Sequence, residues 1–482
     1  GIVSPTDITP FAREVLANLP APNRTGLSNN YESQPRRSDQ NDKGDVRYDH
    51  YLTSKVNFFG RYSHRLLNNF EPPNIPGPSG GNSNGNVRVL NKQVAFGTTW
   101  NVNPASLLEF RMGVSATEGG KFPVFVGEPT VASKFNIPNA PNDPRFTGGL
   151  YSQNVNSYTS FGVQGSNPQF QNPFLINPKI NYSRLMGRHS IKAGWEYQKI
   201  RTQIDDFNPK SGSDSYSGRF SQIPNSPNNN LQFFNDFLVG ARSAYQLNSA
   251  NIVNYRQWMN FFYLQDDFKL TRKLTINAGI RYEFATPQYE RDNALSNLNP
   301  STNTLIQAKA GSIEDRALVK PDHNNWAPRI GMAYTVLPKT VVRAAYGLSY
   351  IHFNRMGGEN LLAYNLPFIL NPIVDSQLPP GVRNGQPLCT SPAQGPNDCF
   401  RTTLQGYPNN FLTLANVKPI NTRTNYIPND LRTAYNQNWH VSIQQQLVGD
   451  WVVDVGYVGA SANKLMILGD YNQARPNRTG ES

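Results

Sequence analysis

The chain has no long hydrophobic run. None of its 482 residues lies in an uninterrupted apolar stretch of about 18 residues, which excludes a membrane-spanning helix. Hydrophobic residues make up 38% of the sequence, below the usual share for a globular protein, whereas aromatic residues reach 11% and 37 Gly and 37 Pro are present. This mixture is typical of strands separated by polar loops, and it leaves a β-structured membrane protein open because such strands carry only a weak alternating signal.

Cysteine is scarce. The two cysteines, Cys389 and Cys399, lie close together in a stretch rich in Pro, Gly and Asn. No His or second Cys pair lies near them, so a local disulfide in an oxidising compartment explains the pair better than a metal site, with free thiols as the alternative. No metal-ligand spacing connects the six histidines, and we expect no metal, no cofactor and no enzymatic centre: His50, His64, His189, His323, His352 and His440.

The charge is basic but scattered. A formal net charge of +12 would permit binding to nucleic acid or to anionic lipid phosphates. We favour a solvated or lumen-lining surface, and no nucleic-acid partner, because Lys and Arg do not cluster. The sequence begins at Gly1 without a Met, a charged leader or an apolar leader. We therefore expect any secretion signal to lie outside this sequence and interpret the chain as a fragment.

The clearest pattern is a β-hairpin over residues 326–350. Large apolar residues alternate with small, polar or basic ones on both strands, with a period of two. A turn at residues 337–339 would place Tyr334 opposite Val342 and Met332 opposite Ala344. It would also place the pairs Val336 with Thr340 and Trp326 with Tyr350 on the same face.

Similar patterns recur along the chain and predict about fourteen strands in seven hairpins. Two weaker strands, 214–222 and 242–252, are separated by a possible short helix between Leu231 and Gly240. The other five predicted strand pairs are 45–50 with 55–64, 94–102 with 108–116, 176–186 with 189–200, 257–270 with 274–284, and 435–447 with 451–457.

The predicted connections fall into two length classes. Turns within hairpins are about three to five residues, whereas connections between hairpins reach roughly 40 residues at 286–324 and roughly 80 residues at 352–432. Short turns at one end and long loops at the other are typical of an outer-membrane barrel. The predicted fold is therefore all-β, a partial antiparallel up-and-down transmembrane β-barrel with long extracellular loops.

The alternation assigns residues to two faces. A water-filled barrel would direct the polar face inward and the apolar face toward lipid, whereas a soluble sheet would bury the apolar face. We expect the following residues to face the lumen: Arg61, Arg111, Lys192, Glu196, Arg281, Glu283, Arg329 and Arg343. We expect the following residues to face lipid: Ile276, Ile280, Ile330, Met332, Tyr334, Val342, Tyr346, Val441, Ile443 and Val455.

Several motifs resemble those of one family. Residues 263–270 (YLQDDFKL) with 274–283 (LTINAGIRYE), and 326–331 (WAPRIG) with 342–347 (VRAAYG), resemble consecutive strand pairs of TonB-dependent outer-membrane receptors. Residues 8–10 (ITP), 187–192 (GRHSIK), 438–444 (NWHVSIQ) and 455–459 (VGYVG) are similar to the Oar-like branch. The resemblance covers nearly the whole chain. It implies a 22-stranded barrel closed by a plug and energised by an inner-membrane TonB complex, and about fourteen strands are too few for that barrel.

The expected function follows from this resemblance. The chain would be the barrel portion of a transporter in the outer membrane of a Gram-negative-type bacterium, in contact with lipid and lipopolysaccharide. It would bind an unknown bulky solute at its loops, with residues 352–432 favoured, and connect to the TonB complex through a plug that this fragment lacks. A non-transporting barrel that acts in adhesion or as a passive pore is the alternative, and a secreted glycan-binding β-protein is a third possibility.

The expected organisation has three parts. Residues 1–42 form a leading segment whose short helix starts at Thr9-Pro10, residues 43–470 form the partial barrel, and residues 471–482 form a truncated tail or loop. The dipeptide Asp266-Asp267 could suggest an acid/base pair, but neighbouring strand residues point to opposite faces, which favours a structural role.

Overall fold

The computed structural model describes most of the chain. The described residues are 3–26, 28–77, 79–80, 83–222, 229–352, 361–375, 382–383, 386–387, 401–414, 417, 424–467 and 469. Cys389 and Cys399 lie outside the described residues, so the expected disulfide stays a prediction.

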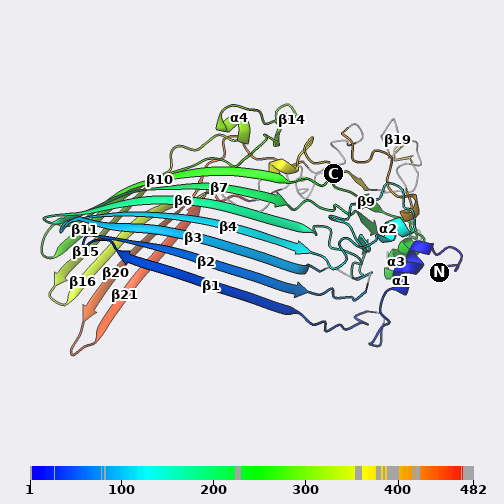
Figure 1. The fold of residues 1–482 in the computed structure, drawn as a ribbon, viewed down its shortest axis with the longest axis horizontal. Helices are drawn as coiled ribbons and strands as arrows, with labels where there is room; N and C mark the ends of the chain where they lie inside the picture. The colour runs from blue at the N-terminus through cyan, green and yellow to red at the C-terminus, as the bar shows by residue number, and fades with distance from the viewer. Residues whose placement is uncertain are drawn as a thin grey trace, which may run out of the picture.

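One antiparallel sheet dominates the molecule. It has 13 strands, and its long members lie side by side in a single curved layer (Figure 1). Each long strand pairs with the long strand before and after it in the sequence, which is the expected up-and-down order. The long strands are β1 (Ser38–Tyr51), β2 (Val56–Glu71), β3 (Gly85–Asn103), β4 (Ser106–Phe122), β6 (Gln169–Met186), β7 (His189–Asp205), β10 (Val253–Lys269), β11 (Leu274–Ala285), β15 (Trp326–Leu337), β16 (Thr340–Ile351), β20 (Ala434–Gln446) and β21 (Val452–Asn463).

The sheet is open along its first and last strands. Among the described residues, no backbone pairing joins β1 to β21. The thirteenth strand, β12 (Tyr289–Glu290), is short and pairs with β10. An all-β, partial, up-and-down barrel is thereby confirmed as the fold class.

One predicted hairpin was wrong. The segments 214–222 and 242–252 do not extend the large sheet. Instead, β8 (Ser213–Tyr216) and β9 (Ala244–Gln246) belong to a separate four-stranded sheet with β5 (Ser152–Val155) and β17 (Ile373–Asp375). All four strands are only three or four residues long, and β5, β8 and β9 are largely buried, so they lack the two-sided exposure that makes long strands alternate. The short helix expected between them is present as α3 (Asn230–Leu238).

Short turns join the long strands at one end of the sheet. These turns are residues 52–55, 104–105, 187–188, 270–273, 338–339 and 447–451. Polar side chains stabilise them: the Thr271 hydroxyl accepts a hydrogen bond from the backbone N–H of Leu274 at 3.0 Å. Gly187 and Gly449 adopt the positive φ values, 58° and 70°, that their turns require. The long connections are 72–84, 123–168, 206–252, 286–325 and 352–433, and their described residues lie at the other end.

The hairpin over residues 326–350, which forms β15 and β16, agrees with its predicted register over most of its length. Tyr334 pairs with Val342 and Met332 with Ala344, as expected. Val336 does not pair with Thr340, because a bulge between Thr335 and Leu337 moves Leu337 into that position. The paired stretch ends at Arg329, short of Trp326.

The first strand begins earlier than predicted. β1 starts at Ser38 rather than near residue 45, because its backbone pairs with β2 as far as Phe70 even though its side chains are polar. Before it, α1 (Pro10–Ala17) has the expected cap, in which Thr9 accepts a hydrogen bond from the Ala12 N–H. The division at residues 42 and 470 stays a prediction.

The hydrophobic core lies mainly in the long connections. We call the unit formed by α1, α2 (Val131–Lys134), α3 and the four-stranded sheet the cap; it stands beyond the loop end of the strands (Figure 1). Phe11, Leu150, Tyr216 and Phe237 are fully buried within it. A second cluster lies where the 286–325 connection, with β13 (Ser296–Asn299), β14 (Thr304–Gln307) and α4 (Ile313–Ala317), meets η1 (Leu361–Tyr364).

Candidate functional site

The strand registers place all residues predicted to face the lumen on one side of the sheet and all residues predicted to face lipid on the other. Ala327 pairs with Arg281 and Ala333 with Arg343, so these arginines share one face with Arg329. The same registers carry this face across to Arg61, Arg111, Lys192, Glu196 and Glu283, and we call it the charged face. All ten residues expected to contact lipid lie on the opposite face, which we call the apolar face. Contact of the apolar face with lipid stays a prediction.

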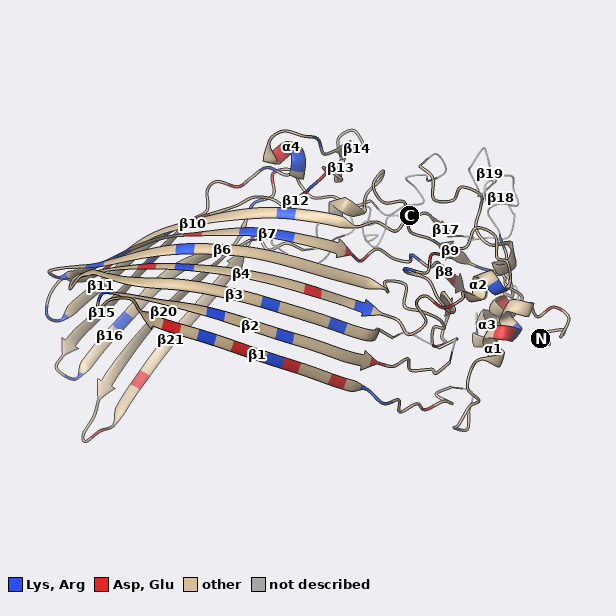
Figure 2. Ribbon diagram, in the orientation of Figure 1, with Lys and Arg blue, Asp and Glu red and all other residues tan. Residues whose placement is uncertain are grey.

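Ion pairs occupy much of the charged face. Arg281 lies 2.9 Å from Glu283, whose second carboxylate oxygen lies 2.7 Å from His352 Nε2. Other predicted face residues also have opposite charges nearby: Arg61 with Asp45, Arg111 with Glu109, Lys192 with Asp267, Glu196 with Lys179, and Arg343 with Asp454. Figure 2 shows charges of both signs spread over the strands rather than gathered in one patch. This arrangement fits mutual pairing in a hydrated wall better than a single ligand site.

The apolar face keeps large side chains exposed. Ile330 is 58% exposed, Ile443 51% and Val455 69%. Near β1 and β2, the rings of Tyr48 and Phe58 lie 6.3 Å apart in an aromatic row. A continuous exposed apolar surface of this extent is a liability in water and is suited to contact with hydrocarbon.

Asp266 and Asp267 point to opposite faces, as their positions on one strand require. Asp266 lies 2.6 Å from His189 Nδ1 on the apolar face. Asp267 accepts a hydrogen bond from Asn277 at 2.6 Å on the charged face. The two carboxylates therefore do not form one acid/base site. Among the described residues, no group of three or more His, Cys, Asp or Glu side chains could hold a metal ion.

A cavity of about 540 Å³ lies at the loop end of the charged face. We call it the loop pocket. It is bounded by the ends of β10, β11, β16, β20 and β21 and by two long connections, and its lining includes Lys320, Asp322, His352, Arg432 and Lys464. Part of the favoured loop, 352–432, thus contributes to a cavity, although many residues of that loop lie outside the described ranges.

Hydrogen bonds fix the two connections that line the loop pocket. The Asp322 carboxylate accepts from Arg432 Nη1 at 3.0 Å and from the Thr433 N–H at 2.9 Å. The Asn297 side chain donates to the Ile427 carbonyl at 2.7 Å and accepts from the Ile427 N–H at 3.1 Å. These contacts join the 286–325 connection to the 424–433 segment, so contacts within the chain position the pocket walls.

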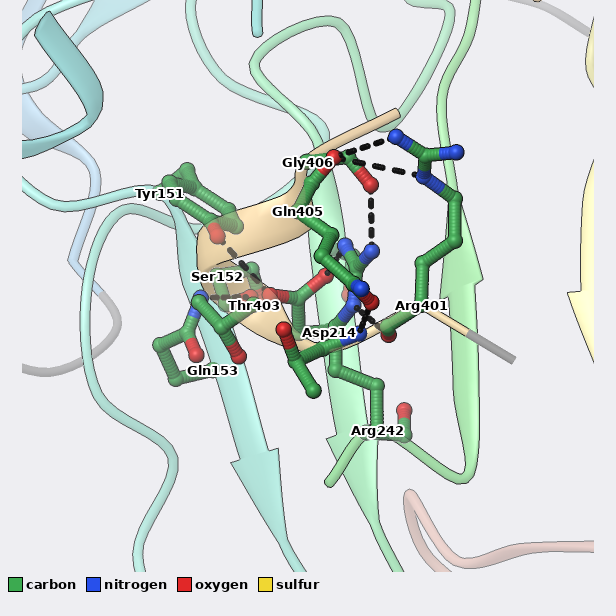
Figure 3. A network of polar contacts seen from close by, with 12 residues as sticks. Tyr151, Ser152, Gln153, Asp214, Arg242, Arg401, Thr403, Gln405 and Gly406 are labelled. Atoms are coloured by element: carbon green, nitrogen blue, oxygen red, sulfur yellow. Dashed lines mark hydrogen bonds and ion pairs between the residues drawn. The ribbon is translucent and has the colours of Figure 1, made fainter. Parts of the chain in front are cut away.

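A buried charged network lies in the centre of the cap (Figure 3). Arg242 and Asp214 are fully buried, and Arg242 Nη1 lies 3.0 Å from Asp214 Oδ1. The Tyr151 hydroxyl donates to Asp214 Oδ2 at 2.8 Å. Arg242 also donates from Nε to the Arg401 carbonyl at 3.0 Å and to the Gly406 carbonyl. The network therefore attaches residues 401–406, part of the longest connection, to the cap.

Burial and charge perturb the ionisable groups of this network. Burial, together with the neighbouring Asp214 carboxylate, raises the pKa of Tyr151 and that of Tyr216 well above the ordinary value of 10.0. Burial acts to lower the pKa of Arg242, but Asp214 opposes it, and the net effect is a raised pKa. The tyrosines therefore stay neutral and the arginine charged, which suits a structural role.

A family model described as outer membrane beta barrel domain matches residues 1–482. The chain belongs to this family. It is therefore an outer-membrane barrel protein, as the alternating hairpins predicted, and its location is the outer membrane. The Oar-like branch stays a prediction because the family match does not distinguish branches.

Solved structures of several outer-membrane proteins are similar to this barrel chain. They include the outer membrane transporter YddB from Escherichia coli (11% identity, 88% of this chain and 40% of that chain, TM-score 0.45). They also include the ferric yersiniabactin uptake receptor FyuA from Yersinia pestis (7%, 88% and 45%, 0.44). A third is the ferric-catecholate import receptor Fiu from E. coli (14%, 88% and 51%, 0.42). The barrel chain thus spans between 40% and 51% of the length of these three proteins.

No curated protein matches the barrel chain. Within the part of the chain that the structure describes, no helix is both long and apolar enough to cross a membrane.

The sequence did not reveal the loop pocket or the buried network of this outer-membrane barrel protein. Arg242 and Asp214 lie in weakly patterned segments, and the residues that pair across the loop pocket, Asp322 and Arg432, are 110 positions apart. Neither pair lies in a sequence segment with a recognisable periodic pattern. The only available signal was the presence of charged residues inside long connections, which is too common to single out a site.

Proposed function

We propose that the chain is the barrel portion of a TonB-dependent transporter that binds a bulky solute at its extracellular loops. Import would be driven by the inner-membrane TonB complex acting through a plug. The observation that carries this proposal is the asymmetry of the sheet, which joins short turns at one end to folded loops with a preformed cavity at the other. Such loops offer a recognition surface, and the charged face offers a wetted wall beneath it.

Two further features support transport over adhesion. The loop pocket opens on the charged face rather than on the outer surface of the cap, since Gln257, Ala285 and Ala434 line it from the strand ends. A solute held there would already be next to the predicted lumen. The motifs at 263–270 and 274–283 resemble strands of TonB-dependent receptors, and they form adjacent strands β10 and β11.

The proposal can be tested by comparing which solutes two bacterial strains remove from a complex medium. Cells that produce the full protein and cells that lack it are grown in the same medium, with and without a protonophore, and solutes are measured by mass spectrometry. We expect at least one solute to be removed only when both the protein and the proton gradient are present.

Two negative results of this experiment would contradict different parts of the proposal. Removal that needs the protein but survives the protonophore would contradict energy coupling and indicate a passive pore. Equal removal by both strains would contradict transport. A strain without TonB serves as the matched control and should behave like the protonophore-treated cells.

A further inference from the structure

The lining of the loop pocket is both apolar and cationic. The apolar part comes from Val319, Ile351, Ile427, Leu431, Leu465 and Met466. Ile351, Leu465 and Met466 are about half exposed, at 50%, 53% and 48%, so they present apolar surface that a ligand could cover. A cavity of about 540 Å³ has the size typical of a small-molecule site.

The charges around the loop pocket do not cancel. The single lining carboxylate, Asp322, is neutralised by Arg432 at 3.0 Å. His352 is directed to Glu283, which also pairs with Arg281. The remaining charged lining residues are Lys320 and Lys464, and neither forms an ion pair with a carboxylate in the described part of the chain.

The two lysines come from different elements and meet at one cavity. Lys320 is held by its backbone, whose N–H donates to the Asn429 carbonyl at 2.8 Å. Lys464 follows β21, and its Nζ lies 5.6 Å from the Tyr435 ring centroid. Two cations that pair with no carboxylate among the described residues, next to apolar surface, would attract an anionic group whose attached body is apolar.

We propose that the loop pocket binds an organic anion with an apolar body and one carboxylate. The apolar body would cover Ile351, Leu465 and Met466, and the carboxylate would lie between Lys320 and Lys464. This inference rests on the proposed function and adds the chemical class of the solute. Because the walls are already joined by Asp322 and Asn297, the site would bind without ordering a loop.

Calorimetry on the full chain in lipid nanodiscs tests this inference. The probes are naphthalene-2-carboxylate and its neutral match, naphthalene-2-carboxamide, with empty nanodiscs as the blank. We expect the carboxylate to bind more tightly than the amide. Changing both Lys320→Gln and Lys464→Gln should weaken carboxylate binding on the order of tenfold and leave amide binding unchanged, because only the charge-assisted contacts are removed.

A matched variant separates local charge from net charge. Lys309→Gln with Lys339→Gln removes the same total charge from an exposed loop and from a short turn, and it should leave both affinities unchanged. A filling variant, Ala434→Trp, should weaken binding of both probes because Ala434 lines the cavity. Circular dichroism of each variant verifies the fold, and the lysine variants alone decide the outcome if the tryptophan variant does not fold.

Three results would overturn the inference: equal affinity of wild type for the two probes, no binding of either, or unchanged carboxylate binding after both lysines are replaced. These measurements need no energy source, so they are independent of the uptake assay. Energy-dependent uptake without probe binding would refute only the pocket assignment, whereas probe binding without energy-dependent uptake would refute only the transport proposal.

Discussion

Replacing Arg242 by methionine should loosen the cap and release the segment that follows residue 400. The substitution removes the cation from the fully buried pair with Asp214 and deletes the hydrogen bonds to the carbonyls of Arg401 and Gly406. An uncompensated buried charge costs about 3–5 kcal/mol. That cost corresponds to an increase of roughly two to three and a half powers of ten in the equilibrium constant for local opening of the cap.

Hydrogen exchange followed by mass spectrometry measures this effect. Amides in residues 213–216 and 401–406 should lose protection by about that factor, whereas amides in β3 and β4 should not change, because the hydrogen bonds and ion pairs of Arg242 among the described residues go to Asp214, Arg401 and Gly406. Adding Asp214→Leu to Arg242→Met should restore much of the protection, because the unpaired charge is then gone. The exposed pair Arg291–Asp292 supplies the control, in which Arg291→Met should have no measurable effect.

The reasoning would be refuted if Arg242→Met left the protection of residues 401–406 unchanged. It would also be refuted if the double substitution were worse than the single one by several kcal/mol, because the pair would then be acting through something other than its charge.

Three further predictions follow from other parts of the molecule. Because burial raises the pKa values of Tyr151 and Tyr216 above 10.0, their contribution to cap stability should be complete below about pH 10 and lost as the pH rises further, which ultraviolet titration of the phenols would detect. Ile330→Arg on the apolar face should cost about 2–4 kcal/mol and reduce assembly into the outer membrane, whereas Ala345→Arg on the charged face should be tolerated, as heat-modifiability on gels would report. Asn365→Ala should cost about 1–3 kcal/mol and increase proteolysis in residues 286–325, since Asn365 donates to the Ser296 and Asn425 carbonyls at 2.7 and 2.8 Å.

The large sheet could be predicted because the side chains of each long strand alternate between two different surroundings, and this alternation is visible in the sequence. In β11 and β15, alternate residues meet opposite surroundings, and a one-residue error would reverse every side chain, so the pattern predicts that Ile276, Ile330 and Met332 share a face. The bulge at Val336 was missed because it depends on the geometry of one turn, which the alternation of neighbouring residues does not encode.

The cap could not be predicted in the same way. Its strands are three or four residues long, and the side chains of β5, β8 and β9 are largely buried, so no period distinguishes one face from another. Its stability depends on contacts such as Tyr216 with Thr403, whose partners are 187 positions apart. The loop pocket has the same property, because Asp322 and Arg432 belong to different connections that meet only after the strands between them have paired.

The separation of short turns from long connections has a practical consequence for protein engineering. The two strands of each hairpin are aligned by a tight turn, for example through the Thr271 hydroxyl between β10 and β11, at the end of the sheet away from the cap. Doubling the length of a connection at the opposite end adds only about 0.6 kcal/mol of closure entropy. Whole connections could therefore be exchanged between related proteins to change what is recognised, while the wall that carries them keeps its alignment.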